Sequence, residues 1–164
     1  MENWCWQEAA LAEISGHYET GEPLPKALLD KMLAAKNFQS GMMVRQLEFS
    51  TAKGVDIQGI LDEVRSQIAV LTPPSFNRFQ HGFAHIFAGG YAAGYYSHKW
   101  AEVLSADAFS RFEAEGIFNS ETGKSFLNTI LEMGDSKEPM ELFKRFMGHK
   151  PNTDALLRHS GIAV

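Results

Sequence analysis

The chain has a single cysteine, Cys5, no long apolar run and no segment in which basic residues gather. A lone cysteine cannot close a disulfide within the chain, and the histidines are not spaced as structural zinc ligands. No apolar stretch approaches the roughly 20 residues that span a bilayer. Lysine and arginine total 15 against 20 acidic residues. These absences argue against a secreted disulfide scaffold, a membrane partner and a nucleic-acid partner.

The amino terminus also lacks a secretory signal. Its first residues, MENWCWQEAALAE, are acidic and aromatic, whereas a signal peptide is basic and then apolar. We therefore expect a reducing compartment, the cytoplasm. At 164 residues, 45% of them hydrophobic and 21% charged, the chain suits a single globular domain covering residues 1–164.

Patterns typical of strands are missing, whereas helical periodicity recurs along the chain. No segment alternates apolar and polar residues with an excess of Val, Ile and Thr. Apolar residues instead recur every three or four positions, which predicts an all-α fold of about seven to eight helices. The predicted helices cover residues 4–19, 25–37, 38–53, 57–68, 91–116, 120–133, 138–147 and 152–161. Asn3 and Asp56 are expected to cap the first and fourth of them, and Pro73 and Pro74 to lie in a loop.

Polar aromatic residues and glycines crowd the segment HIFAGGYAAGYYSHKW, residues 85–100. On a helix, Tyr91, Tyr95 and His98 would lie at i, i+4 and i+7, so their side chains would share one face. Gly89 and Gly90 precede them and permit positive φ or the close approach of another backbone. Phenol and imidazole are neutral hydrogen-bond donors, which suits stabilisation of a developing oxyanion.

The same spacing has a plainer interpretation. Aromatic stripes at helical spacing usually pack in a core, with the tyrosine hydroxyls at its rim and Gly94 at a helix contact. The other histidines are weaker candidates, because His81 and His85 stand four apart without a glutamate between them and could hold a metal only weakly. The stripe Met42, Met43 and Leu47 is expected to be core.

Several longer segments resemble one enzyme family. They include MENWCW, RQLEF, FAHIFAGGYAAGYYSHKWAEVLSADAFSRFE, TGKSF and EPMELFKRFMG, and they extend from Met1 to about Ile162. In them the chain is similar to the carboxy-terminal part of the thimet oligopeptidase and peptidyl-dipeptidase family of zinc metallopeptidases. The resemblance implies a helical lobe of a zincin-like oligopeptidase that cleaves short peptides, with residues 1–164 a fragment of the larger catalytic domain.

The resemblance also has implications for the metal. Members of the family hold zinc with a His-Glu-x-x-His helix and a downstream glutamate, and both precede the segment that resembles MENWCW. The 164 residues contain no such helix motif. The resemblance therefore implies zinc in the intact enzyme, none bound by this chain, and no peptide hydrolysis by this chain alone.

What remains resembles the substrate-binding wall of the family. The resemblance implies substrate contact by His85, Tyr91 and Tyr95, with Tyr91 as the oxyanion donor. Gly89, Gly90 and His98 are predicted to line the same substrate site. Two histidines depart from the family pattern. His98 stands where relatives usually carry tyrosine, which places its role as a substrate contact in question, and His149 replaces an arginine context.

A second hypothesis belongs to another class of protein. Removing the rest of a two-lobed enzyme would expose an apolar face, and such faces tend to be covered by association. The chain would then be a non-catalytic helical interaction module that forms a homodimer or pairs with a separate amino-terminal peptidase fragment. Trp4 and Trp6 point to different sides of a helix and both favour burial, which is consistent with a missing cover.

Overall fold

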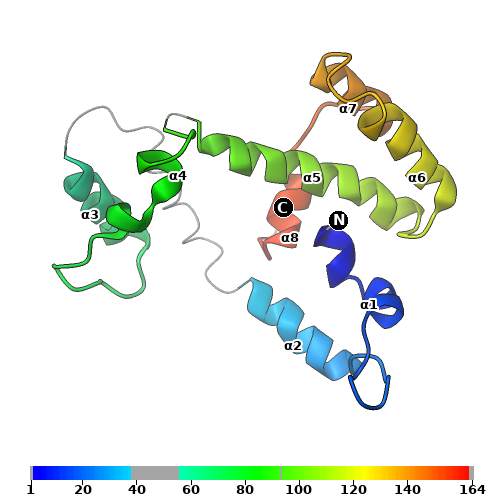
Figure 1. The fold of residues 1–164 in the computed structure, drawn as a ribbon, viewed down its shortest axis with the longest axis horizontal. Coiled ribbons are helices and arrows are strands. Elements are labelled where there is room, and N and C mark those ends of the chain that lie inside the picture. Colours follow the sequence, from blue (N-terminus) through cyan, green and yellow to red (C-terminus); the bar gives the residue numbers. More distant parts are fainter. Residues whose placement is uncertain (1, 38–55, 93, 163–164) are drawn as a thin grey trace. The chain divides into compact units, whose positions relative to one another are not determined.

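A computed structural model describes residues 2–37, 56–92 and 94–162, and all regular structure in these ranges is helical (Figure 1). The prediction of an all-α fold is confirmed. The elements are η1 (Glu2–Trp6), α1 (Glu8–Ile14), α2 (Lys26–Lys36), α3 (Ile57–Ile68), η4 (Phe79–Gly82), α4 (Ala84–Phe87), α5 (Tyr96–Glu115), α6 (Ser120–Phe126), η5 (Leu127–Leu131), α7 (Pro139–Met147) and α8 (Asp154–His159). The helix predicted over 38–53, with its methionine stripe, lies outside the described residues.

The chain divides into two compact units, one formed by residues 1–38 with 102–164 and the other by residues 39–101. In the first unit the core is aromatic. Phe109 and Phe112 of α5 and Phe146 of α7 are at most 4% exposed. Trp4 packs edge-on against the two α5 rings, with centroids 4.5 and 4.7 Å away, and its indole N–H donates to the Ile117 carbonyl at 3.0 Å. This tryptophan is therefore covered within the unit.

The first predicted helix is wrong at both ends. Asn3 does not cap it, because its amide donates to Ser105 Oγ at 3.3 Å and η1 precedes α1. The helix stops at Ile14, since Ser15 is extended and its hydroxyl donates to the Leu11 carbonyl. Beyond it the His17 ring nitrogen Nδ1 accepts two backbone N–H groups in a turn. Local side-chain hydrogen bonds therefore end the helix before residue 19, where the sequence predicted its end.

The later helices of the first unit largely follow the prediction. Asn119 caps α6 by accepting the N–H groups of Glu121 and Thr122. The helix continues as the π-helical η5, which packs against α7 (Figure 1). Gly148 ends α7 with φ of +80°, a conformation that favours glycine.

In the second unit, α3 is the element that the sequence predicted best. Asp56 caps it, its carboxylate accepting the Gly59 N–H at 2.8 Å. Leu61 is fully buried and forms a small core with Phe83 and Ile86. The predicted proline loop follows, without helix from residue 69 to 78. None of the helices in the described part of the chain has the length and apolar character to cross a bilayer.

Candidate functional site

Four polar rings gather in the second unit, as the segment 85–98 predicted. The ring centroid of His98 lies 4.7 Å from that of Tyr91 and 4.8 Å from that of Tyr95. The His85 ring lies 6.1, 5.8 and 6.1 Å from the rings of Tyr91, Tyr95 and His98 respectively. We call these four residues the His-Tyr cluster.

The backbone conformation that brings these rings together differs from the predicted one. The helix expected over 91–116 begins only at Tyr96, so Tyr91 and Tyr95 are not on it. Two successive turns replace its start, in which Tyr91 O accepts from Gly94 N and Tyr95 O accepts from His98 N, both at 3.1 Å. The His85 carbonyl accepts the Tyr91 N–H and holds this part of the chain in a turn, which explains the late start.

One glycine of the pair is required by close approach. A methyl group at Gly89 would lie 2.9 Å from the His85 carbonyl oxygen, which itself accepts the Tyr91 N–H at 3.2 Å. Gly89 therefore lets the chain turn back so that His85 and Tyr91 face each other. Gly90 would meet nothing within 4 Å, and neither glycine has positive φ.

The rings of the cluster differ in exposure. Tyr95 is half-buried and packs edge-on against Phe83 of the core, with centroids 4.9 Å apart. Tyr91 is 41% exposed and His85 is exposed. His98 is half-buried, and its Nε2 atom is buried without a hydrogen-bond partner among the described residues. The packing interpretation thus fits Tyr95, whereas the exposed rings of Tyr91 and His85 are accessible to a ligand.

The cluster can donate hydrogen bonds but does not form a metal centre. Among residues 2–37, 56–92 and 94–162, no group of three or more His, Cys, Asp and Glu side chains could hold a metal ion. The residues described here therefore do not fit the zinc of a metallopeptidase. Two phenols and two imidazoles around one turn instead suit a polar ligand rich in carbonyl oxygens.

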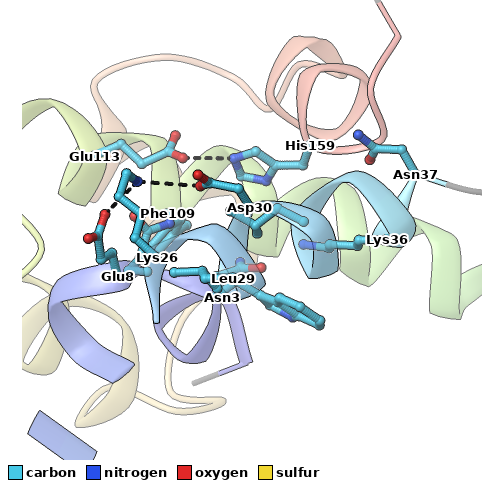
Figure 2. Close-up of a pocket in the computed structure, with 13 residues that line it drawn as sticks. Asn3, Glu8, Lys26, Leu29, Asp30, Lys36, Asn37, Phe109, Glu113 and His159 are labelled. Carbon is cyan, nitrogen blue, oxygen red and sulfur yellow. Dashed lines mark hydrogen bonds and ion pairs between the residues drawn. The ribbon is translucent and has the colours of Figure 1, made fainter. Parts of the chain in front are cut away.

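A pocket of about 350 Å³ lies in the first unit, between η1, α1, α2, α5 and α8 (Figure 2). Lys26 bridges Glu8 at 2.8 Å and Asp30 at 3.3 Å, and the hydrogen bond to Glu8 is the main cause of a raised Lys26 pKa. His159 Nε2 lies 3.0 Å from Glu113 Oε1. The charges of this pocket largely pair with one another, which indicates a structural role.

Sequence reasoning did not predict this pocket. Its lining comes from three separate parts of the chain, within residues 3–37, 109–113 and 159. No motif joins them, because the ion pairs form only once the helices have packed. The one local signal is the i, i+4 spacing of Lys26 and Asp30 on α2.

Comparison with known proteins identifies the family of this helical chain. The model of peptidase family M3 matches residues 1–162, and the chain belongs to this family. The resemblance found in the sequence is confirmed at that level.

Individual relatives match over nearly the whole chain. Oligopeptidase A of Escherichia coli is 61% identical over 174 residues, covering 99% of this chain and 26% of its own length. The probable cytosolic oligopeptidase A of Arabidopsis thaliana is 46% identical, and a thimet-like oligopeptidase of Dictyostelium discoideum is 32% identical. Both matches cover 99% of this chain. They cover 25% of the Arabidopsis protein and 26% of the Dictyostelium protein. The chain thus spans about a quarter of the length of the relatives it matches.

Proposed function

We propose that residues 1–164 act as one module of a larger catalytic domain and form the substrate-binding part of a zinc oligopeptidase that cleaves short peptides. The observation that carries this proposal is the His-Tyr cluster. It places exposed and half-buried neutral donors around one turn, where a peptide carbonyl can accept from them. Membership of peptidase family M3 supports the substrate class.

The four rings have separate roles in this proposal. Tyr91 is the oxyanion donor, because its phenol is the exposed member next to the turn. His85 and Tyr95 hold the substrate backbone, Tyr95 being fixed by its contact with Phe83. Gly89 and Gly90 keep the surface beside the turn free of side chains. The buried His98 Nε2 gains a partner when a peptide carbonyl or a rearranged phenol reaches it.

In the proposal this chain does not hydrolyse peptides by itself, and the zinc ligands and the general base belong to the rest of a family-length protein. The cluster binds and orients the scissile carbonyl. Charge then develops on the carbonyl oxygen, and the donors are already in place. We place the protein in the cytoplasm, consistent with its one cysteine.

The test is hydrolysis of a quenched fluorescent peptide in the presence of zinc. The isolated chain should give no turnover above buffer. A mixture with a polypeptide that carries the remaining three quarters of Escherichia coli oligopeptidase A should give turnover that a chelator abolishes. Chelator-sensitive turnover by the isolated chain would contradict the proposal.

A non-catalytic interaction module is the second candidate, and exposed apolar side chains favour it. Val70, Leu71 and Phe76, in the loop of the second unit, are 80%, 82% and 80% exposed. Side chains of this kind tend to be covered by another surface. Light scattering measures the oligomeric state, and the fluorescence of a dye for apolar surface measures the exposed patch. A stable monomer that binds no such dye would contradict self-association.

A further inference from the structure

A buried carboxylate in the first unit has a half-exposed histidine as its basic neighbour. The Asp107 side chain of α5 is 3% exposed, and its Oδ2 atom accepts the Asn152 N–H at 3.0 Å. The ion pairs between described residues give this carboxylate one basic partner, His149. A buried carboxylate is costly unless it is paired and fully hydrogen-bonded.

His149 is the nearest basic group, but it does not supply that pairing when it is neutral. Its Nδ1 atom lies 3.8 Å from Asp107 Oδ2, which is too long for a hydrogen bond. The same nitrogen lies 2.8 Å from the Lys150 carbonyl oxygen, to which it donates. The ring is 46% exposed and stands at the border of the site.

A cavity of about 700 Å³ adjoins Asp107. Asp154 adds a second carboxylate to its lining. Arg158 also lines it, but its guanidinium forms an ion pair with Glu113, donating to Oε2 at 2.6 Å. Ala155 and Ile162 contribute an apolar wall. The cavity thus combines a buried acid, whose histidine partner lies 3.8 Å away, with a surface on which an alkyl stem can lie.

We propose that this cavity binds a guanidinium or ammonium group, with the cation on Asp107 and its alkyl stem against Ala155 and Ile162. A guanidinium fits best, because it can donate two parallel hydrogen bonds to one carboxylate. The group can come from an arginine side chain of a peptide or from a free small cation. This site goes beyond the proposed function and shares no residue with the His-Tyr cluster.

The test is a titration of the 164-residue chain with methylguanidinium at constant ionic strength, followed by NMR. We expect saturable shifts of the backbone signals of Asp107, Asn152 and Ala155, with a dissociation constant in about the millimolar range. Tetramethylammonium, which has the same charge but no N–H donor, should not produce them. Asp107→Asn should weaken binding at least about tenfold, whereas the exposed control Asp62→Asn should leave it unchanged.

A second variant keeps the test decisive if Asp107→Asn unfolds. In His149→Arg the new guanidinium can itself reach Asp107, so the melting temperature should rise and methylguanidinium should no longer bind. His81→Arg makes the same change at an exposed position of the second unit and should bind as wild type does. No saturable binding by wild type, or equal binding by His149→Arg, would overturn the proposal.

Peptide titrations distinguish the two sources of the cation, an arginine side chain and a free small cation. The blocked tripeptide acetyl-Gly-Arg-Gly-amide is titrated beside its citrulline counterpart, which has the same shape without the charge. Tighter binding of the arginine peptide than of methylguanidinium assigns the site to peptide side chains, and equal binding assigns it to a free small cation. Equal binding of the citrulline peptide would contradict a cation site altogether.

Discussion

At the scale of single residues, Tyr91 and Tyr95 have different surroundings, and we expect different roles for them. Both are phenols within 5 Å of the same imidazole. Tyr95 packs on the core through Phe83, whereas Tyr91 is not part of that core among the described residues and is 41% exposed. Loss of the Tyr95 ring should therefore cost stability, and loss of the Tyr91 hydroxyl should cost activity.

Tyr91→Phe tests the oxyanion role in the mixture of this chain with the rest of oligopeptidase A. Removal of one preorganised donor should lower kcat about 100-fold, with KM changed much less, because the hydrogen bond strengthens as charge develops. Steady-state kinetics on the quenched peptide measure both constants. Tyr96→Phe is the matched control, since Tyr96 is 60% exposed and outside the cluster. Equal losses in the two variants would refute the role of Tyr91.

His98→Phe tests the unpaired ring nitrogen. A buried polar atom without a partner costs about 1–3 kcal/mol, and phenylalanine replaces the ring with a similar shape without that atom. We expect the free energy of unfolding in urea to stay the same or to rise by up to about 1 kcal/mol. A clear fall would show that Nε2 has a stabilising partner.

At the scale of elements, caps and turns determine where the helices begin. Asp56→Ala should lower the free energy of unfolding by about 1 kcal/mol, because the Gly59 N–H loses its acceptor. Asp56→Asn keeps an acceptor and is the control. Hydrogen exchange localises the effect, and the first turn of α3 should exchange faster in Asp56→Ala alone. Unchanged exchange there would contradict the cap.

The link between α5 and α6 should make stability depend on pH. The hydrogen bond from Thr122, and then the Arg111 guanidinium, hold the pKa of Glu115 below its ordinary value. A carboxylate whose pKa is lowered on folding contributes stability that is fully present above its unfolded pKa. That stability is lost as the pH falls through the folded pKa.

Thr122→Val tests this link, because it removes the hydroxyl from a nearly fully buried side chain and keeps its shape. Wild type should lose more stability than the variant between pH 7 and pH 3, as measured by urea unfolding at each pH. Ser120→Ala, at an exposed position of α6, is the control and should follow wild type. Parallel curves for wild type and Thr122→Val would exclude the Thr122 contribution.

The elements also show how far the sequence could predict this fold. The regular periodicity of α3 and its Asp56 cap are local features, and both were predicted correctly. The start of α5 was missed because the turn at Tyr91 depends on the approach of the His85 carbonyl, not on propensity. The π-helical η5 also carries no local signal.

At the scale of the whole molecule, the sequence predicted that the site residues lie close together, but the predicted backbone arrangement was wrong. One helix face was expected to align Tyr91, Tyr95 and His98, whereas two turns bring them together. The Asp107 cavity could not be predicted, because Asp107 and Asn152 are 45 positions apart and no motif connects them. Pairings across such separations follow from packing.

The length of the relatives bears on function at this scale. The chain aligns with about a quarter of oligopeptidase A, and its described residues offer no metal-holding group. All four rings of the His-Tyr cluster lie within the second unit. We therefore propose that peptide binding and peptide hydrolysis are separable, and that binding belongs to this chain.

The most direct measurement of that claim is an NMR titration of the isolated chain with a short blocked peptide in the absence of zinc. The account predicts that the ring signals of His85, Tyr91 and Tyr95 shift together with one dissociation constant, and that those of Tyr18, which is 87% exposed, do not. Ring signals of the cluster that stay unchanged at saturating peptide would contradict it.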